Sequence, residues 1–174
     1  MGHGMHVVNG STAYTTSDDF CRIFSAEMDG LYLLALLLTG DAGKAEQCFV
    51  AGIGNCVEGN AVFREWARSW ARRSIVVQAI QAIAPAKGAQ AVSIPAPPEL
   101  DPALQVVFRL DVFERFVYVM SVLEGFSHQD CAILLGVSRP SVVSARARAI
   151  GRLASQSTMM QTEEIQTAYA SVSH

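Results

Sequence analysis

The sequence predicts an all-α protein made of two small helical domains. Three observations predict this fold class. Apolar residues recur every three or four positions over most of the chain, which is the period of a helix buried along one side. Residues 85–101 are rich in Pro and Ala, a composition typical of a linker. Residues 126–153 have the pattern of a helix-turn-helix.

The first domain is predicted over residues 19–84. A flexible tail over residues 1–18 precedes it, because that segment is rich in Ser, Thr and Gly and has no periodicity. Apolar residues at helical spacing begin at Phe20. Residues 31–38 form a nearly all-apolar run, which is typical of a fully buried helix.

A further helix of this domain is expected after the Thr-Gly-Asp sequence that ends at Asp41. The Asp41 carboxylate can cap a helix that runs from Ala42 to about Ile53. Gly52 and Gly54 lie near its end, and a glycine inside a helix costs about 1 kcal/mol relative to alanine. The sequence therefore predicts a frayed end.

A longer helix is predicted from Val62 to Ile83, closed by Pro85. Trp66 and Trp70 share one stripe, and two tryptophans at this spacing are more often core residues than ligand contacts. One flank carries arginines at four-residue spacing, namely Arg64, Arg68 and Arg72. This flank is either a solvated face or a surface for nucleic acid.

The second domain is predicted over residues 102–153. Within its helix-turn-helix, Ser127 and Ser138 can cap the first and second helices. Three residues fill the structural roles of the motif, which are a small residue at the helix crossing, a turn residue that tolerates positive φ, and an apolar residue facing the first helix: Ala132, Gly136 and Val142. Residues 154–174 are expected to be a loosely attached helix or a C-terminal tail.

The second helix of this motif carries four arginines and no acidic residue: Arg139, Arg146, Arg148 and Arg152. A positive helix edge of this kind suits DNA phosphates. The helical phase directs Arg146 toward the core and Arg148 toward solvent. The alternative is a plain helical hairpin, with a C-cap glycine and a solvated arginine face.

The composition excludes several classes of protein. No apolar run reaches the ~20 residues of a membrane span, and no basic start followed by an apolar core marks a leader, so we expect a cytoplasmic protein without a membrane partner. The four cysteines form no C-x-x-C pair, and the four histidines form no ligand pair. No metal site, cofactor, catalytic residue or small-molecule substrate is predicted.

Three runs of sequence, in this order, resemble the extracytoplasmic-function sigma factors of bacterial RNA polymerase, a group of the sigma-70 family. Residues 31–49, LYLLALLLTGDAGKAEQCF, look like the start of region 2 of these proteins. Residues 63–80, FREWARSWARRSIVVQAI, resemble the end of that region. Residues 113–153 are similar to region 4, including the E-G-F-S and L-G-V-S turns.

This resemblance implies a protein that makes no covalent chemistry and directs core RNA polymerase to promoter DNA, and it allows an anti-sigma factor as a further partner. It implies three sets of contact residues. The −35 element would be read from the second helix of the helix-turn-helix by Arg139, Ser141, Ser144, Arg148 and Arg152. The −10 element would be bound by Arg64, Arg68, Arg72 and Trp66. Core polymerase would be bound by Asp41, Glu46 and Gln47.

The sequence also departs from the family pattern. Only about six residues, 57–62, separate the third and fourth helices where the family has a longer loop that captures a promoter base, and the end of region 2 is neutral rather than basic. A second interpretation is therefore a sigma-like protein-interaction module that does not open promoters. A third is a helix-turn-helix regulator whose N-terminal helices dimerise, although the match of residues 31–80 to region 2 argues against it.

Overall fold

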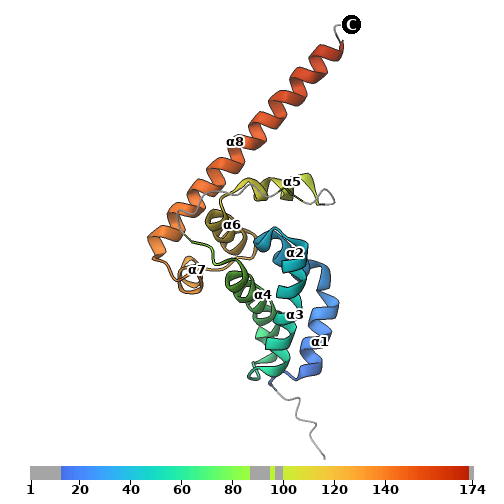
Figure 1. The fold of residues 1–174 in the computed structure, drawn as a ribbon, viewed down its shortest axis with the longest axis vertical. Helices are drawn as coiled ribbons and strands as arrows, with labels where there is room; N and C mark the ends of the chain where they lie inside the picture. The colour runs from blue at the N-terminus through green and yellow to red at the C-terminus, as the bar shows by residue number, and fades with distance from the viewer. Residues whose placement is uncertain (1–12, 87–94, 97–99, 173–174) are drawn as a thin grey trace, which may run out of the picture.

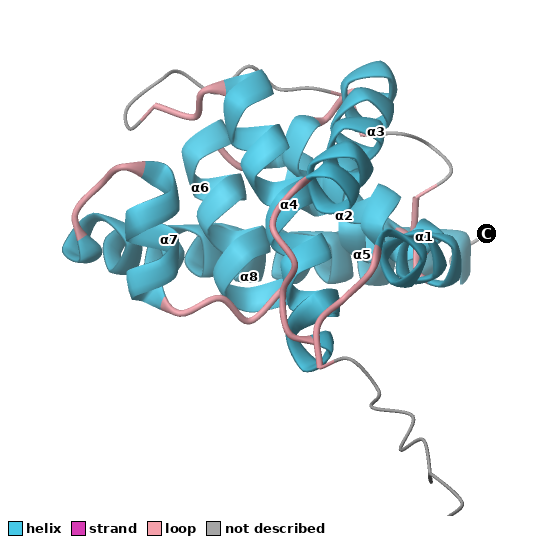
Figure 2. Cartoon of the chain, turned by 90° about the horizontal axis from the view of Figure 1, so that it is seen from below, coloured by secondary structure: helices cyan, strands magenta, loops and turns pink. Residues whose placement is uncertain are grey.

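The computed structural model describes residues 13–86, 95–96 and 100–172, with side chains described as far as residue 156. Every regular element within these ranges is helical, and the strand-like contact between Tyr14 and Phe63 is an isolated bridge (Figures 1 and 2). The all-α prediction is confirmed. No helix in the described part of the chain is both long and apolar enough to cross a membrane.

The first domain is a bundle of four helices, in which α2, α3 and α4 make the most extensive contacts with one another (Figure 1). Its elements are α1 (Ser17–Ala26), α2 (Met28–Thr39), α3 (Ala42–Glu58), the 3₁₀ turn η1 (Arg64–Trp66) and α4 (Ala67–Ile83). Helix α2 is mostly buried from Leu31 to its end, as its apolar run predicts. It ends at Gly40, whose φ of 70° favours glycine.

The segment before α1 is ordered from residue 13, so the predicted flexible tail over residues 1–18 is wrong for its last six residues; residues 1–12 lie outside the described part of the chain. Thr15 is buried, and its hydroxyl donates to the Val62 carbonyl at 3.1 Å. Thr16 caps α1 in a reciprocal capping box with Asp19. The bond to Val62 joins positions 47 residues apart, so the local composition gave no sign of it and indicated a tail.

The prediction that helix α3 frays at its glycines is wrong. The helix continues through both of them to Glu58. Helix α4 approaches α3 closely at Gly52, since a Cβ built there would lie 2.6 Å from Cδ1 of Ile75. The Ser74 hydroxyl on α4 also donates to the Gly52 carbonyl at 3.1 Å. The glycine therefore permits close helix packing, and this packing offsets its low helix propensity.

The second domain is built from short elements followed by one long helix. They are α5 (Pro102–Gln105), the 3₁₀ turn η2 (Val106–Arg109), α6 (Val112–Tyr118), the π-helical turn η3 (Val119–Leu123), α7 (His128–Leu135) and α8 (Arg139–Val172). Residues 154–174 were expected to form a loosely attached helix or a tail; α8 continues through them to Val172 as a helix that projects from the body (Figure 1). No Gly or Pro follows Gly151, so nothing in the sequence stops the helix.

The two domains touch, and their buried apolar residues form one continuous cluster. Of the predicted linker over residues 85–101, residues 85–86, 95–96 and 100–101 are described and none is helical. Arg115 of α6 lies in the contact between the domains, where its guanidinium donates to the Leu38 carbonyl of α2 at 3.3 Å. The side chains of the second domain are therefore placed against those of the first.

Candidate nucleic-acid interface

The helix-turn-helix has the geometry that the sequence predicts. Ser127 caps α7 by accepting from the Asp130 amide at 3.0 Å, and Gly136 ends that helix with a φ of 63°. Ser138 accepts from the Ser141 amide at 3.4 Å in the first turn of α8. The two serines and the glycine thus fix where each helix begins and where α7 ends.

Packing between α7 and α8 sets the rotation of α8 about its axis. Ala132 on α7 is buried, and Val142, Ala145 and Ala149 on α8 are fully buried at 0% exposure. These three residues recur at helical spacing, so they define the inner face of α8. Arg146 lies beside them, half-buried with its Nε buried and without a hydrogen-bond partner, as the predicted phase requires.

The outer face of α8 carries small and apolar side chains more than charged ones. Val143 is 45% exposed, and Ser144 and Ala147 are also exposed. Arg139 is exposed at the first position of the helix, whereas Ser141 is half-buried and its hydroxyl lies 2.9 Å from that of Ser138. Of the predicted contact residues in the first two turns, Arg139 and Ser144 therefore have the freest access to a partner.

Arg148 and Arg152 make ion pairs inside their own domain. Arg148 Nε lies 2.7 Å from Oε1 of Glu114, and Arg152 Nη1 lies 2.8 Å from Asp111 and 3.0 Å from Oε2 of Glu114. Glu114 is 2% exposed, although it stands at the N-terminal end of α6. The hydrogen bond to Asp111, followed by the nearby carboxylates, raises the pKa of Arg152. Glu114 therefore competes with phosphates for both arginines.

Replacing Glu114 by glutamine is expected to steepen the salt dependence of DNA binding. Each phosphate neutralised by a released arginine changes the slope of log K against log salt by about −0.9. With Arg148 and Arg152 both released, the slope should steepen by about 1 to 2, measured by fluorescence anisotropy over a salt series. Glu46→Gln removes one exposed acidic charge from α3 and is the matched control. An equal change in both variants would show that net charge, and not release of the arginines, is responsible.

The arginine flank of the first domain is also paired with acidic groups. Arg64 lies 3.2 Å from Asp19, and Arg68 lies 3.1 Å from Glu27. Hydrogen bonds from the Thr16 backbone and side chain lower the pKa of Asp19, and the charge of Arg64 adds to the effect. The flank is thus present where the sequence predicts it, with much of its charge compensated.

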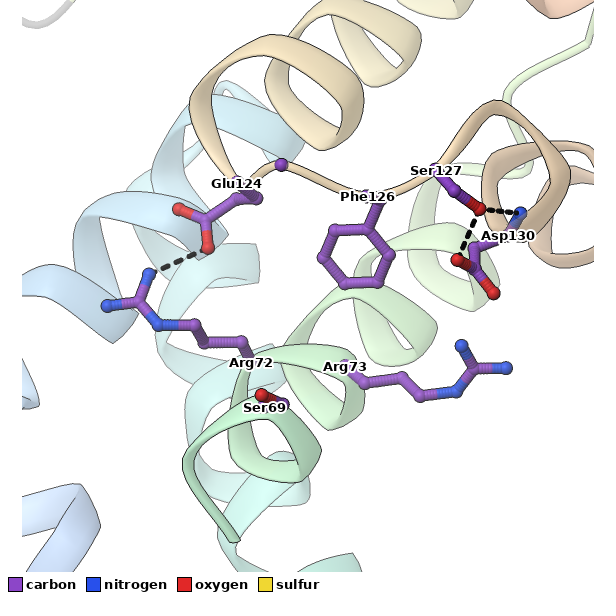
Figure 3. A pocket seen from close by; sticks show the side chains of 8 residues that line it. Ser69, Arg72, Arg73, Glu124, Phe126, Ser127 and Asp130 are labelled. Atoms are coloured by element: carbon purple, nitrogen blue, oxygen red, sulfur yellow. Dashed lines mark hydrogen bonds and ion pairs between the residues drawn. The ribbon is translucent and has the colours of Figure 1, made fainter. Parts of the chain in front are cut away.

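Arg72 joins the two domains. Its guanidinium lies 2.7 Å from Glu124, in the turn after η3 (Figure 3). It also lies 3.4 Å from Glu27 of the first domain. Its hydrogen bond to Glu124 raises its pKa. A pocket of about 410 Å³ opens beside this ion pair, between α4 and the start of α7, and is lined by Ser69, Arg72, Arg73, Glu124, Gly125, Phe126, Ser127 and Asp130.

The tryptophans of the first domain lie on the surface, so their assignment to the core was wrong. Trp66 is 56% exposed and Trp70 is 43% exposed. Phe63 contacts Trp66 edge to face at 5.1 Å and stacks on Tyr14 at 4.7 Å, which gives a row of three exposed rings. The 3₁₀ turn η1 precedes α4 and shifts the phase, and small residues, Ala67 and Ala71, face the bundle instead.

The candidate polymerase-binding residues lie together at the start of α3. Asp41 caps this helix, with Oδ1 accepting from the Lys44 amide at 2.8 Å. Asp41, Glu46 and Gln47 are all exposed. They form an acidic and polar surface that does not include the arginine flank of α4.

Sequence reasoning missed Glu114, Glu124 and Tyr14. Each one acts through a residue between 34 and 52 positions away in the chain. The one local signal was Glu114, an acidic residue that stands beside Arg115 in the mostly apolar residues 112–120. A buried carboxylate requires a positive partner, but its position in the sequence does not say which arginine supplies it.

The capped turn between α7 and α8 defines a helix-turn-helix. Residues 105–153 match the family model described as Sigma-70, region 4, so this part of the chain is similar to that region of the sigma-70 family. Among solved structures, the chain is similar to the sigma factor RpoE from Bartonella quintana, crystallised in complex with the anti-sigma factor NepR. The sequence identity is 18% and the TM-score is 0.48, over 78% of this chain and 94% of that one. No curated protein matches the chain.

Proposed function

We propose that the chain is a sigma factor of the extracytoplasmic-function group, which directs core RNA polymerase to promoters. The observation that carries this proposal is the region 4 match over residues 105–153, together with the outer face of α8 that these residues leave exposed. Region 4 domains of the sigma-70 family support DNA binding in transcription initiation. The helix-turn-helix would place α8 in the major groove of the −35 element.

In this arrangement the start of α8 enters the groove first. Arg139 and Ser144 are exposed there and can reach phosphates or base edges. Arg148 and Arg152 lie farther along the helix, and DNA phosphates would replace Glu114 as their partner. They would fix the register of the domain on the duplex.

The first domain would contact the −10 element. The exposed rings of Phe63 and Trp66 offer a surface on which an unpaired base can stack. Arg64 and Arg68 flank these rings and would exchange their carboxylate partners for phosphates. Stacking tolerates any base, so this contact would add affinity for separated strands more than sequence preference.

The start of α3 would bind core polymerase. The full chain should be retained by immobilised core polymerase, and the double variant Glu46→Arg, Gln47→Arg should lose at least tenfold in affinity, because it reverses the charge of that surface. Glu58→Arg places a similar charge at the exposed far end of α3 and serves as the control. Equal retention of all three proteins would move the polymerase contact elsewhere.

The pairing of all three flank arginines with acids favours a second candidate function. A chain with a compensated −10 surface could bind polymerase and the −35 element without separating strands. The two functions differ on a promoter whose −10 region is mismatched in advance. Transcription from both the duplex and the mismatched template supports the first function, whereas transcription from the mismatched template alone supports the second.

A further inference from the structure

The first turns of α8 carry few side chains that can form hydrogen bonds with bases. Val143, Ser144 and Ala147 are exposed there. Val143 keeps 45% of its surface exposed although valine is commonly buried. Reading guanine or adenine from the major groove uses a long side chain with two hydrogen-bonding atoms, such as Arg, Asn or Gln. None of these three side chains has that capacity.

The remaining arginines of the helix are directed elsewhere. Arg146 leans toward the core, with its Nε buried. Arg148 and Arg152 are paired with the buried carboxylate of Glu114. Arg139, at the helix start, is exposed. Methyl groups therefore make up much of the surface that the helix offers to the groove.

Thymine is the one base that presents an apolar group, its C5-methyl, in the major groove. We propose that Val143 and Ala147, one helical turn apart, read thymine methyl groups, so that A·T pairs form the centre of the bound site. The proposal rests on the proposed function, because it specifies what α8 recognises in DNA. It makes Val143 a specificity-determining residue and leaves phosphate contact to the arginines.

The test replaces thymine by deoxyuridine, which removes only the methyl group. A duplex is first selected from a random pool with the full chain, and each thymine of the selected site is then replaced singly. Affinity should fall about fourfold at one or two positions, the factor that corresponds to burial of one methyl-sized group. In the Val143→Ala variant, the affinity for the thymine duplex should fall. The ratio of the affinities for the thymine and deoxyuridine duplexes should approach one at one of those positions.

Val50→Ala on α3 is the matched control, because Val50 is a 61% exposed valine of the first domain. This variant should keep the full deoxyuridine penalty. The proposal is overturned if the chain selects a site and binds it with the same affinity after every thymine has been replaced. If the chain selects no sequence at all, the proposed function in DNA recognition is overturned together with this proposal. The two failures are therefore distinguishable.

Discussion

Replacing Gly136 by valine is expected to abolish specific DNA binding. Gly136 has a φ of 63°, and a β-branched residue resists this conformation, at a cost of about 1–3 kcal/mol. The turn is also held by the Val137 amide, which donates to the Ala132 carbonyl at 3.0 Å. Because this turn sets the angle between α7 and α8, relief of the strain moves α8 away from its position. DNA affinity should fall more than tenfold, and the melting temperature should fall with it.

Gly30→Val is the control for this substitution. Gly30 lies on α2 in helical conformation, and a Cβ built there has no neighbour within 4 Å. This variant should keep both the melting temperature and the DNA affinity of the parent chain. A Gly136→Val protein that also keeps both values would show that the turn is not strained by a side chain.

Replacing Arg115 by methionine is expected to raise the free energy of unfolding by about 1–3 kcal/mol. Arg115 is fully buried between the domains, its Nε and Nη1 have no hydrogen-bond partner, and no acidic side chain pairs with it in the described part of the chain. Burial lowers its pKa to about 10. Methionine keeps the contact with Phe108, whose ring centroid lies 5.7 Å from the guanidinium carbon, and removes the charge.

The pH dependence of this difference follows from the direction of the shift. The folded protein binds the Arg115 proton less tightly than the unfolded chain, so the destabilisation is fully present at neutral pH and decreases as pH rises above about 10. Urea unfolding of both proteins at pH 7 measures the stability difference, and unfolding above pH 10 measures its decrease. The exposed Arg109→Met is the control and should change stability by less than about 0.5 kcal/mol. A destabilised Arg115→Met protein would show that the bond to Leu38 outweighs the cost of burial.

The parts of the fold that local signals determine could be predicted from the sequence. Ser127 and Gly136 mark the ends of α7 because capping and positive φ depend on neighbouring residues only. Burial of α2 follows from its uninterrupted apolar run. The extension of α3 beyond Gly52 could not be predicted in the same way, because it depends on Ile75 of another helix.

The candidate interface could also be predicted only where local signals determine it. Helical spacing placed Arg148 on the exposed side of α8 and Arg146 toward the core. Spacing could not show that Glu114 holds Arg148, or that Glu124 holds Arg72 from the other domain. Such pairs are set by how elements distant in the chain pack together, and these pairs determine how much charge is free for nucleic acid.

Transcription with purified components tests the central claim most directly. Core RNA polymerase is incubated with genomic DNA fragments, with and without the full chain, and the 5′ ends of the transcripts are mapped. We expect discrete start sites that need the chain and share an upstream sequence, and we expect Gly136→Val to abolish them. If polymerase binds the chain and still yields the same transcripts with and without it, on duplex and on pre-separated templates, the chain is not a sigma factor.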